Sequence, residues 1–74
     1  MRYKINLRWD AEAAVWIATS NDVPGLVLES GSFDALLERV KQAVPELIVL
    51  NGAQPSDFRL SYFTEREDQV PMYG

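Results

Sequence analysis

Few side chains in this sequence can do chemistry, because its 74 residues include no cysteine and no histidine. Disulfides and thiolate metal sites are therefore excluded, and the commonest general base and metal ligand is missing. One acidic cluster, Glu65, Glu67 and Asp68, could hold a cation or clamp a basic partner. Nothing in the local sequence fixes the geometry of these carboxylates, so we interpret them as part of a solvated segment. We expect no catalysis, no metal and no cofactor.

A second group of candidates is basic. Arg2, Lys4 and Arg8 lie on one side of an alternating segment, and Arg59 can join them from a neighbouring strand. Such a stripe could contact RNA phosphates. RNA-binding sheets usually add exposed aromatic side chains, and only Phe63 is placed for that role. The net charge of -4 also disfavours nucleic acid, so we treat RNA contact by this stripe as the alternative to cross-strand pairing with Glu residues or protection of a sheet edge by charge.

The third candidate is an apolar pair, Val15 and Ile17, in a segment that is apolar on both faces. In the expected hairpin they fall beside Arg8 and Asn6, on the face away from the core. A strand with one face in water should not look like this. Either a partner covers that face, or the register is shifted by one residue and the pair belongs to the core. We favour a protein interface formed by these four residues.

Four segments have the pattern of β-strands, either alternating apolar and polar residues or rich in β-forming residues between turn formers. They cover residues 2–9, 14–19, 26–30 and 57–63. Residues 10–13 would close the first hairpin and place Leu7 opposite Trp16. Pro24 and Gly25 suit a type II turn before the third strand, and residues 54–56 indicate a loop.

An amphipathic helix of about 18 residues gives the clearest signal. Its apolar residues recur at spacings of three and four: Phe33, Leu36, Leu37, Val40, Val44, Leu47 and Ile48. Ser32 should cap its N-terminus, and Gly52 should stop it. Pro45 lies inside the pattern and should kink the helix or break it in two.

The order β-β-β-α-β predicts an α+β domain over residues 1–63, followed by a polar tail over residues 64–74. We expect a four-stranded mixed sheet, covered on one face by the kinked helix and open on the other, with its last strand parallel to the first. Trp9 and Trp16 are assigned to the core, which in so small a domain needs their area. Because that core is marginal, we expect a homo-oligomer, specifically a homodimer.

No apolar run approaches the length that a bilayer requires, and the first residues do not have the pattern of a signal peptide. Together with the lack of cysteine, this composition leads us to expect a cytoplasmic protein that does not contact a membrane.

Several motifs over about residues 3–52 resemble the HicB-like antitoxin domains. The resemblance is carried by Trp9-Asp10, Val15-Trp16-Ile17-Ala18-Thr19-Ser20, Asp22-Val23-Pro24-Gly25-Leu26 and Gly31-Ser32-Phe33-Asp34-Ala35-Leu36-Leu37. The most specific part is the stretch from Asp22 to Leu26 after the tryptophan-bearing strand. The chain is similar in particular to a bacterial branch of small single-domain members, which also carry a proline late in the helix.

This resemblance implies a partial RNase H-like fold and a role in neutralising a small, basic, RNA-cleaving toxin of a toxin–antitoxin system. RNase H enzymes need carboxylates around their metal, one of them on the first strand. Here the outward positions of that strand are Arg2, Lys4, Asn6 and Arg8, so we expect no nuclease activity. The expected function is a non-catalytic protein-binding module. The alternatives are a small RNA-binding module and a homo-oligomeric protein without a ligand.

Overall fold

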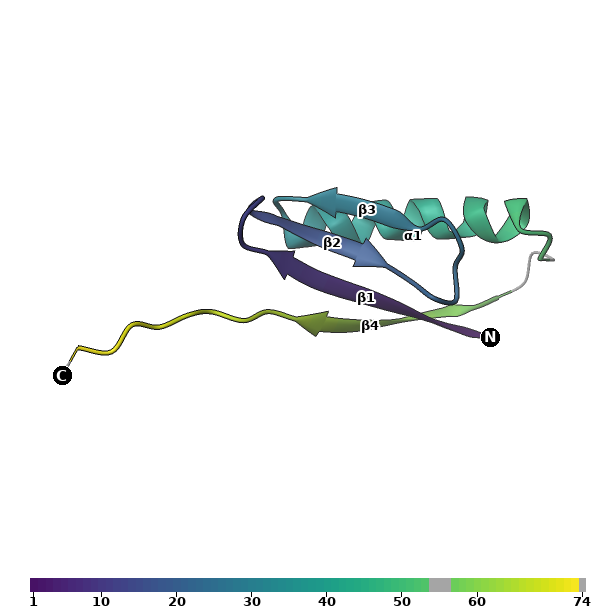
Figure 1. Ribbon diagram of the computed structural model, residues 1–74. Helices are drawn as coiled ribbons and strands as arrows, with labels where there is room; N and C mark the ends of the chain where they lie inside the picture. Colours follow the sequence, from purple (N-terminus) through teal and green to yellow (C-terminus); the bar gives the residue numbers. More distant parts are fainter. Residues whose placement is uncertain (54–56, 74) are drawn as a thin grey trace.

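The computed structural model describes residues 1–53 and 57–73 (Figure 1). In chain order its elements are β1 (Arg2–Asp10), β2 (Val15–Thr19), β3 (Val27–Ser30), α1 (Phe33–Leu50) and β4 (Arg59–Glu65). The strands form a four-stranded sheet in the order β3-β2-β1-β4, in which β1 runs parallel to β4 and the other neighbours are antiparallel. The predicted α+β fold is confirmed. β4 begins and ends two residues later than the predicted 57–63, and the loop expected at residues 54–56 lies outside the described residues.

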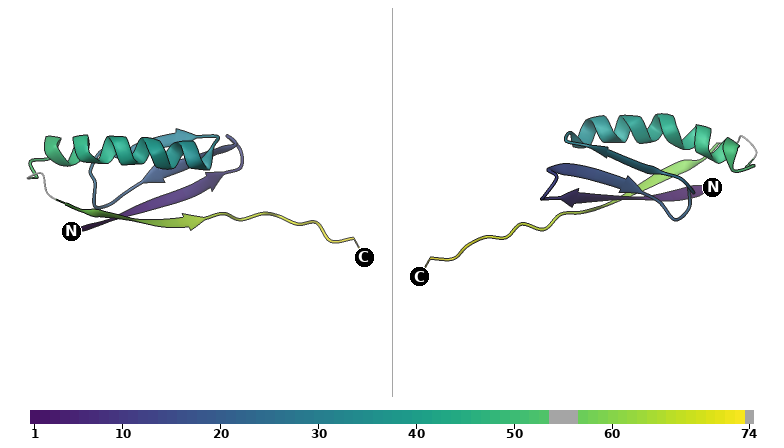
Figure 2. Two further views of the ribbon diagram at one scale, coloured as in Figure 1. Left: turned by 180° about the vertical axis from the view of Figure 1, so that it is seen from behind. Right: turned by 45° about the horizontal axis from the view of Figure 1, so that its top comes forward.

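One face of the sheet packs against α1 (Figure 2). Alternate strand positions meet helix positions spaced by four, as the two side-chain periodicities require. The buried core consists of Tyr3, Ile5, Leu7, Ala18, Val23, Leu26, Leu36, Val40, Val44 and Ile48. Leu60 and Tyr62 of β4 pack against this core but are only half-buried, because β4 is an edge strand.

α1 has the predicted 18 residues and runs without interruption through Pro45. The break that we expected as one outcome at this proline is therefore wrong. Val44 and Ile48 are both buried on the same stripe, while Pro45 itself faces solvent. Packing on both sides of the proline holds the helix together. No helix in the described part of the chain is long and apolar enough to cross a membrane.

The ends of α1 confirm the predicted caps. Ser32 Oγ accepts a hydrogen bond from the Ala35 N–H at 3.2 Å, which satisfies a free amide of the first turn. Gly52 takes a φ of 87°, and its N–H donates to the Val49 carbonyl at 3.0 Å. This left-handed conformation carries little strain at glycine, so the helix ends where the sequence indicates.

The first hairpin differs from its predicted register. Leu7 lies opposite Ala18 instead of Trp16, and Trp9 lies opposite Trp16. Each pairing is thus displaced by two positions along β2. Because side chains alternate with a period of two, this displacement leaves every side chain on its predicted face of the sheet.

Asp10 is the cause of the displacement. It closes β1 instead of opening the loop, and its Oδ1 accepts the N–H groups of Glu12 and Ala13 at 3.0 and 3.3 Å. An aspartate that bonds to the backbone two residues ahead favours a turn after itself. Ala14 completes the loop with a φ of 55°, which is uncommon for a residue other than glycine.

The bend before β3 agrees with the prediction. Gly25 has a φ of 89°, and the Leu26 N–H donates to the Val23 carbonyl at 3.2 Å across the turn. Proline at the second position and a glycine with positive φ at the third are the residues that this turn requires.

Tyr62 leads to a first prediction. Its Oη is buried and finds no hydrogen-bond partner among the described residues, and burial raises the pKa of its phenol. A buried hydroxyl without a partner costs about 1–3 kcal/mol. We therefore expect Tyr62→Phe to keep the free energy of unfolding or raise it by about 1 kcal/mol, measured by urea denaturation. Because the pKa of Tyr62 is raised in the fold, the unfolded chain loses this proton first, and the free energy of unfolding should fall as pH rises above 10. This decrease should be smaller in Tyr62→Phe than in the wild type.

Tyr3→Phe is the matched control, because the Tyr3 Oη donates to the Met1 sulfur at 3.6 Å. We expect this variant to be neutral or slightly destabilised. A clear loss of stability in Tyr62→Phe alone would show that its hydroxyl has a partner after all.

Candidate binding face of the sheet

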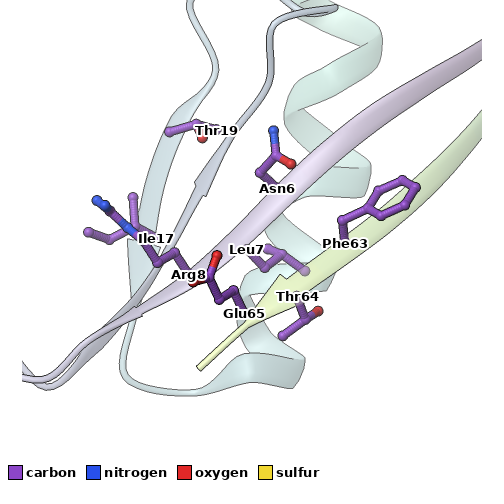
Figure 3. Close-up of a pocket in the computed structure, with 8 residues that line it drawn as sticks. All are labelled: Asn6, Leu7, Arg8, Ile17, Thr19, Phe63, Thr64 and Glu65. Carbon is purple, nitrogen blue, oxygen red and sulfur yellow. The ribbon is translucent and has the colours of Figure 1, made fainter. Parts of the chain in front are cut away.

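The sheet face turned away from α1, which we call the open face, carries side chains from all four strands. They occupy the strand positions that alternate with the core positions. They are Arg2, Lys4, Asn6, Arg8, Asp10, Val15, Ile17, Thr19, Val27, Glu29, Arg59, Ser61, Phe63 and Glu65. A shallow depression near the middle of this face is lined by Asn6, Leu7, Arg8, Ile17, Thr19, Phe63, Thr64 and Glu65 (Figure 3).

Ile17 lies in a row of side chains that crosses the whole sheet. On one side it pairs with Glu29 of β3, and on the other with Arg8 of β1. Arg8 in turn pairs with Glu65 of β4. The row therefore reads acid, apolar, base, acid, with neighbouring strands about 4.8 Å apart. Ile17 is half-buried among these neighbours.

Two further apolar side chains lie on the open face. Val27 is 70% exposed and Phe63 is 53% exposed. Val27 pairs with Thr19, which puts it diagonally next to Ile17, whereas Phe63 lies beyond β1 on β4. Val15, Ile17 and Val27 are therefore apolar neighbours on the open face, and Phe63 lies apart from them.

The four residues of the predicted interface do share the open face, but their pairing differs from the prediction. Val15 lies opposite Asp10 instead of Arg8, and Ile17 lies opposite Arg8 instead of Asn6. This is the displacement by two positions that the loop imposes. The four residues of the predicted interface therefore still share one face of the sheet, and Asp10 is an additional acidic neighbour opposite Val15.

The predicted basic stripe is divided in two. Arg2 pairs directly with Arg59, and Lys4 is the next open-face residue of β1. Arg8 lies apart from these three, in the row with Glu65. Basic charge is therefore concentrated at the end of the sheet where β1 and β4 begin, whereas the end near the first hairpin is mixed.

Lys4 is held in place at this basic end. Its backbone N–H donates to Asp22 Oδ2 at 2.7 Å, and its backbone carbonyl accepts from Ser20 Oγ at 2.6 Å. The pairing of β1 with β2 begins only at Asn6, so side chains of the loop after β2 supply the bonds that a paired strand would make to Lys4. Its Nζ lies 4.5 Å from the centroid of the Phe63 ring, a cation–π contact. The one aromatic ring predicted to be available for stacking is thus covered in part by a lysine.

The acidic cluster, which begins at the last residue of β4, does not form a preorganised site. Glu65, Glu67 and Asp68 are all exposed, and Asp68 lies 3.5 Å from Arg66 Nε. Within residues 1–53 and 57–73, no group of three acidic, histidine or cysteine side chains is placed to hold a metal ion.

An aromatic cluster at the hairpin end of the core was not anticipated. The Trp9 and Trp16 rings are 5.4 Å apart, and Trp16 meets Phe33 at 4.9 Å. The Arg66 guanidinium lies 4.4 Å from the Trp9 ring. Both tryptophans are half-buried at the edge of the core instead of inside it. Alternation along β3 could have identified Val27 as an open-face residue, whereas no local signal identifies the contact of Arg66.

Comparison with known proteins gave two matches. The sequence profile of a family described as "Domain of unknown function (DUF1902)" matches residues 2–73. The crystal structure of a hypothetical protein from the extremely thermophilic bacterium Thermus thermophilus is similar, with a TM-score of 0.74 and 33% sequence identity. The alignment covers 97% of this chain and 100% of that chain. No curated protein matches.

Proposed function

Because the chain belongs to the DUF1902 family of domains of unknown function, we propose its role from its own surface: it is a non-catalytic protein-binding module that holds a small basic protein on its open face. The contact is made by the hairpin half of that face, where Val15 and Ile17 lie together with Glu29 on one side and with Arg8 and then Glu65 on the other. The observation that carries this proposal is the row in which Ile17 lies between charged residues and faces away from the core.

The apolar centre supplies the affinity. Val15 and Ile17 are half-buried, and the neighbouring Val27 is 70% exposed, so a partner can remove a substantial apolar area from water. Full burial of one such side chain contributes about 1.5–3 kcal/mol. A strand that is apolar on both of its faces is typical of a sheet that is covered on both sides.

The charges around the centre select the partner. Glu29 and Glu65 stand at the two ends of the Ile17 row, and Asp10 lies opposite Val15. These carboxylates complement a basic surface, whereas the basic end of the sheet repels one. The two ends therefore act together to favour one position for a basic partner.

The resemblance of residues 3–52 to HicB-like antitoxin domains supports the identity of the partner. In this proposal the chain acts as an antitoxin that sequesters a small basic RNA-cleaving toxin in the cytoplasm. The cysteine-free composition is compatible with that compartment.

A second prediction tests this role. The proposal requires that a short basic protein with a catalytic histidine is encoded beside the gene for this chain, and that protein is the probe; an isolated gene would count against the antitoxin role. Ile17→Lys should weaken binding of that protein by about tenfold or more, because it replaces the apolar centre by a charge that repels a basic surface. Isothermal titration calorimetry measures the affinity, and a thermal melt confirms that the variant is folded.

The matched control is Val49→Lys, which adds the same charge at a position of α1 that is 54% exposed. Its affinity should equal that of the wild type. An equal loss in both variants, or a neighbouring toxin that the wild type neither binds nor neutralises in a growth assay, would contradict the proposal.

One observation favours RNA as the second candidate. Arg2, Arg59 and Lys4 meet at one end of the open face, and phosphate contacts by such a cluster depend steeply on salt. Fluorescence titration of single-stranded RNA at low and high salt separates the two functions. Salt-sensitive binding that Lys4→Gln weakens and Ile17→Lys leaves unchanged would favour RNA.

A further inference from the structure

The segment after β4 leaves the body of the molecule. Figures 1 and 2 show residues 66–73 running away from the sheet in an extended path, past the first hairpin. The molecule measures 58 Å along its longest axis and only 19 and 18 Å across. An extended segment of this length spans about 25 Å at about 3.3 Å per residue, so the segment accounts for much of the elongation. We call residues 66–73 the arm.

The end of the arm is not polar, although the sequence led us to expect a polar tail. Val70, Met72 and Tyr73 are 76%, 93% and 93% exposed. Apolar side chains gathered on a projecting segment indicate a surface that another chain covers. The arm also carries three charged residues near β4, which keeps it in water until it is covered.

The sheet offers an edge of matching length. β4 has seven residues and pairs with β1 on one side; on its outer side, no strand of the described chain pairs with it. Unpaired strand edges are templates for pairing with a further strand. The opposite edge, β3, has only four residues and is too short for the whole arm.

We propose that the arm of one copy of this chain adds as a strand to the outer edge of β4 in a second copy, and that the exchange is reciprocal. The result is a homodimer in which two sheets are joined along their β4 edges. The arm continues β4 in the same chain, so a two-fold axis between antiparallel β4 strands brings each arm onto the other β4. The open face stays free, and the exchange is therefore independent of the proposed binding function.

The faces of the arm fit this arrangement. A two-fold axis perpendicular to the sheet puts even-numbered residues opposite even-numbered ones, on the same face of the joined sheet. Val70 and Met72 then lie on the same side as Leu60 and Tyr62, the half-buried residues at the edge of the core. Pro71 is tolerated, because the arm becomes the outermost strand at that point.

A third prediction tests the exchange with the full chain. Sedimentation equilibrium at micromolar concentration should show a dimer for the wild type. Val70→Asp should raise the dimer dissociation constant by about tenfold or more, because it places a charge against the core-side edge. Gln69→Asp adds the same charge one residue away, on the other side of the arm, and should change the constant by less than about threefold. Both side chains are exposed, so neither change affects the fold of the single chain.

Isotope-filtered NMR on a mixture of labelled and unlabelled protein gives a second readout. Contacts between copies should connect the methyl groups of Val70 and Met72 to Leu60 and Tyr62. A wild type that stays monomeric, equal effects of the two aspartates, or contacts between copies through Ile17 would each overturn the exchange. The first two outcomes leave the affinity for a basic protein that Ile17→Lys tests unchanged, whereas contacts between copies through Ile17 would also count against a free open face.

Discussion

Leu36→Ala is expected to lower the free energy of unfolding by about 2–5 kcal/mol. Leu36 lies on the buried stripe of α1, with no exposed surface, and belongs to the core between the helix and the sheet. Its truncation removes apolar contacts and leaves a cavity that the neighbours fill only in part. A single domain of this length has a total stability of about 4–11 kcal/mol, so the variant should be largely unfolded at elevated temperature. Urea denaturation with linear extrapolation measures the loss.

Leu50→Ala is the control for the same chemical change in the same helix. Leu50 is 80% exposed, and its truncation should change the free energy of unfolding by less than about 0.5 kcal/mol. Leu36 lies on the core side of the sheet, so the folded fraction of Leu36→Ala should bind a basic partner as the wild type does. Equal losses in the two leucine variants would mean that the core is not where α1 places it.

The helix could be predicted from the sequence because each of its determinants is local. The apolar spacing, the Ser32 cap and the Gly52 stop lie within the segment that they define, and all three are found as expected. The same holds for the faces of the strands. Val15 and Ile17 stay on the open face even though the hairpin register was wrong, since a displacement by two preserves the alternation.

The register itself could not be predicted in the same way. It depends on the side chain of Asp10 bonding to the loop and on Ala14 accepting a positive φ, and many other residues could occupy either position. A loop of the same length placed one residue earlier satisfies the pattern equally well. The packing of Trp9 against Trp16 and of Trp16 against Phe33 also distinguishes the two registers, and these contacts depend on the assembled fold.

The composition of the candidate site depended on pairings between distant segments. The division of the basic stripe follows from the parallel register of β1 and β4, which sets Arg2 against Arg59 and Arg8 against Glu65. β2, β3 and the whole of α1 separate these two strands in the chain. No local pattern fixes the register of β4 along β1, so the position of Glu65 at one end of the Ile17 row is seen only in the structure.

Pro45→Ala is expected to raise the free energy of unfolding by about 1–3 kcal/mol. The proline has no N–H to donate to the Lys41 carbonyl, and its ring crowds that carbonyl, which together cost about 3 kcal/mol in a helix interior. Alanine restores the donor, and the greater freedom of the unfolded chain offsets about 0.4–1 kcal/mol of the gain. Urea denaturation measures the change, and slower hydrogen exchange in the last turns of α1 would locate it. Glu46→Ala, at the next exposed position, should change stability by less than about 0.5 kcal/mol.

The opposite result would give the proline a structural role. If the proline bends α1 so that its second half follows the twisted sheet, Pro45→Ala would straighten the helix and lift Ile48 from the core, and stability would fall. The burial of Val44 and Ile48 argues against this, because residues four apart share one stripe in a straight helix as well. Pro45 is exposed and the stripe is continuous across it. The helix therefore keeps its proline at a net cost, which the packing of the flanking residues against the sheet offsets.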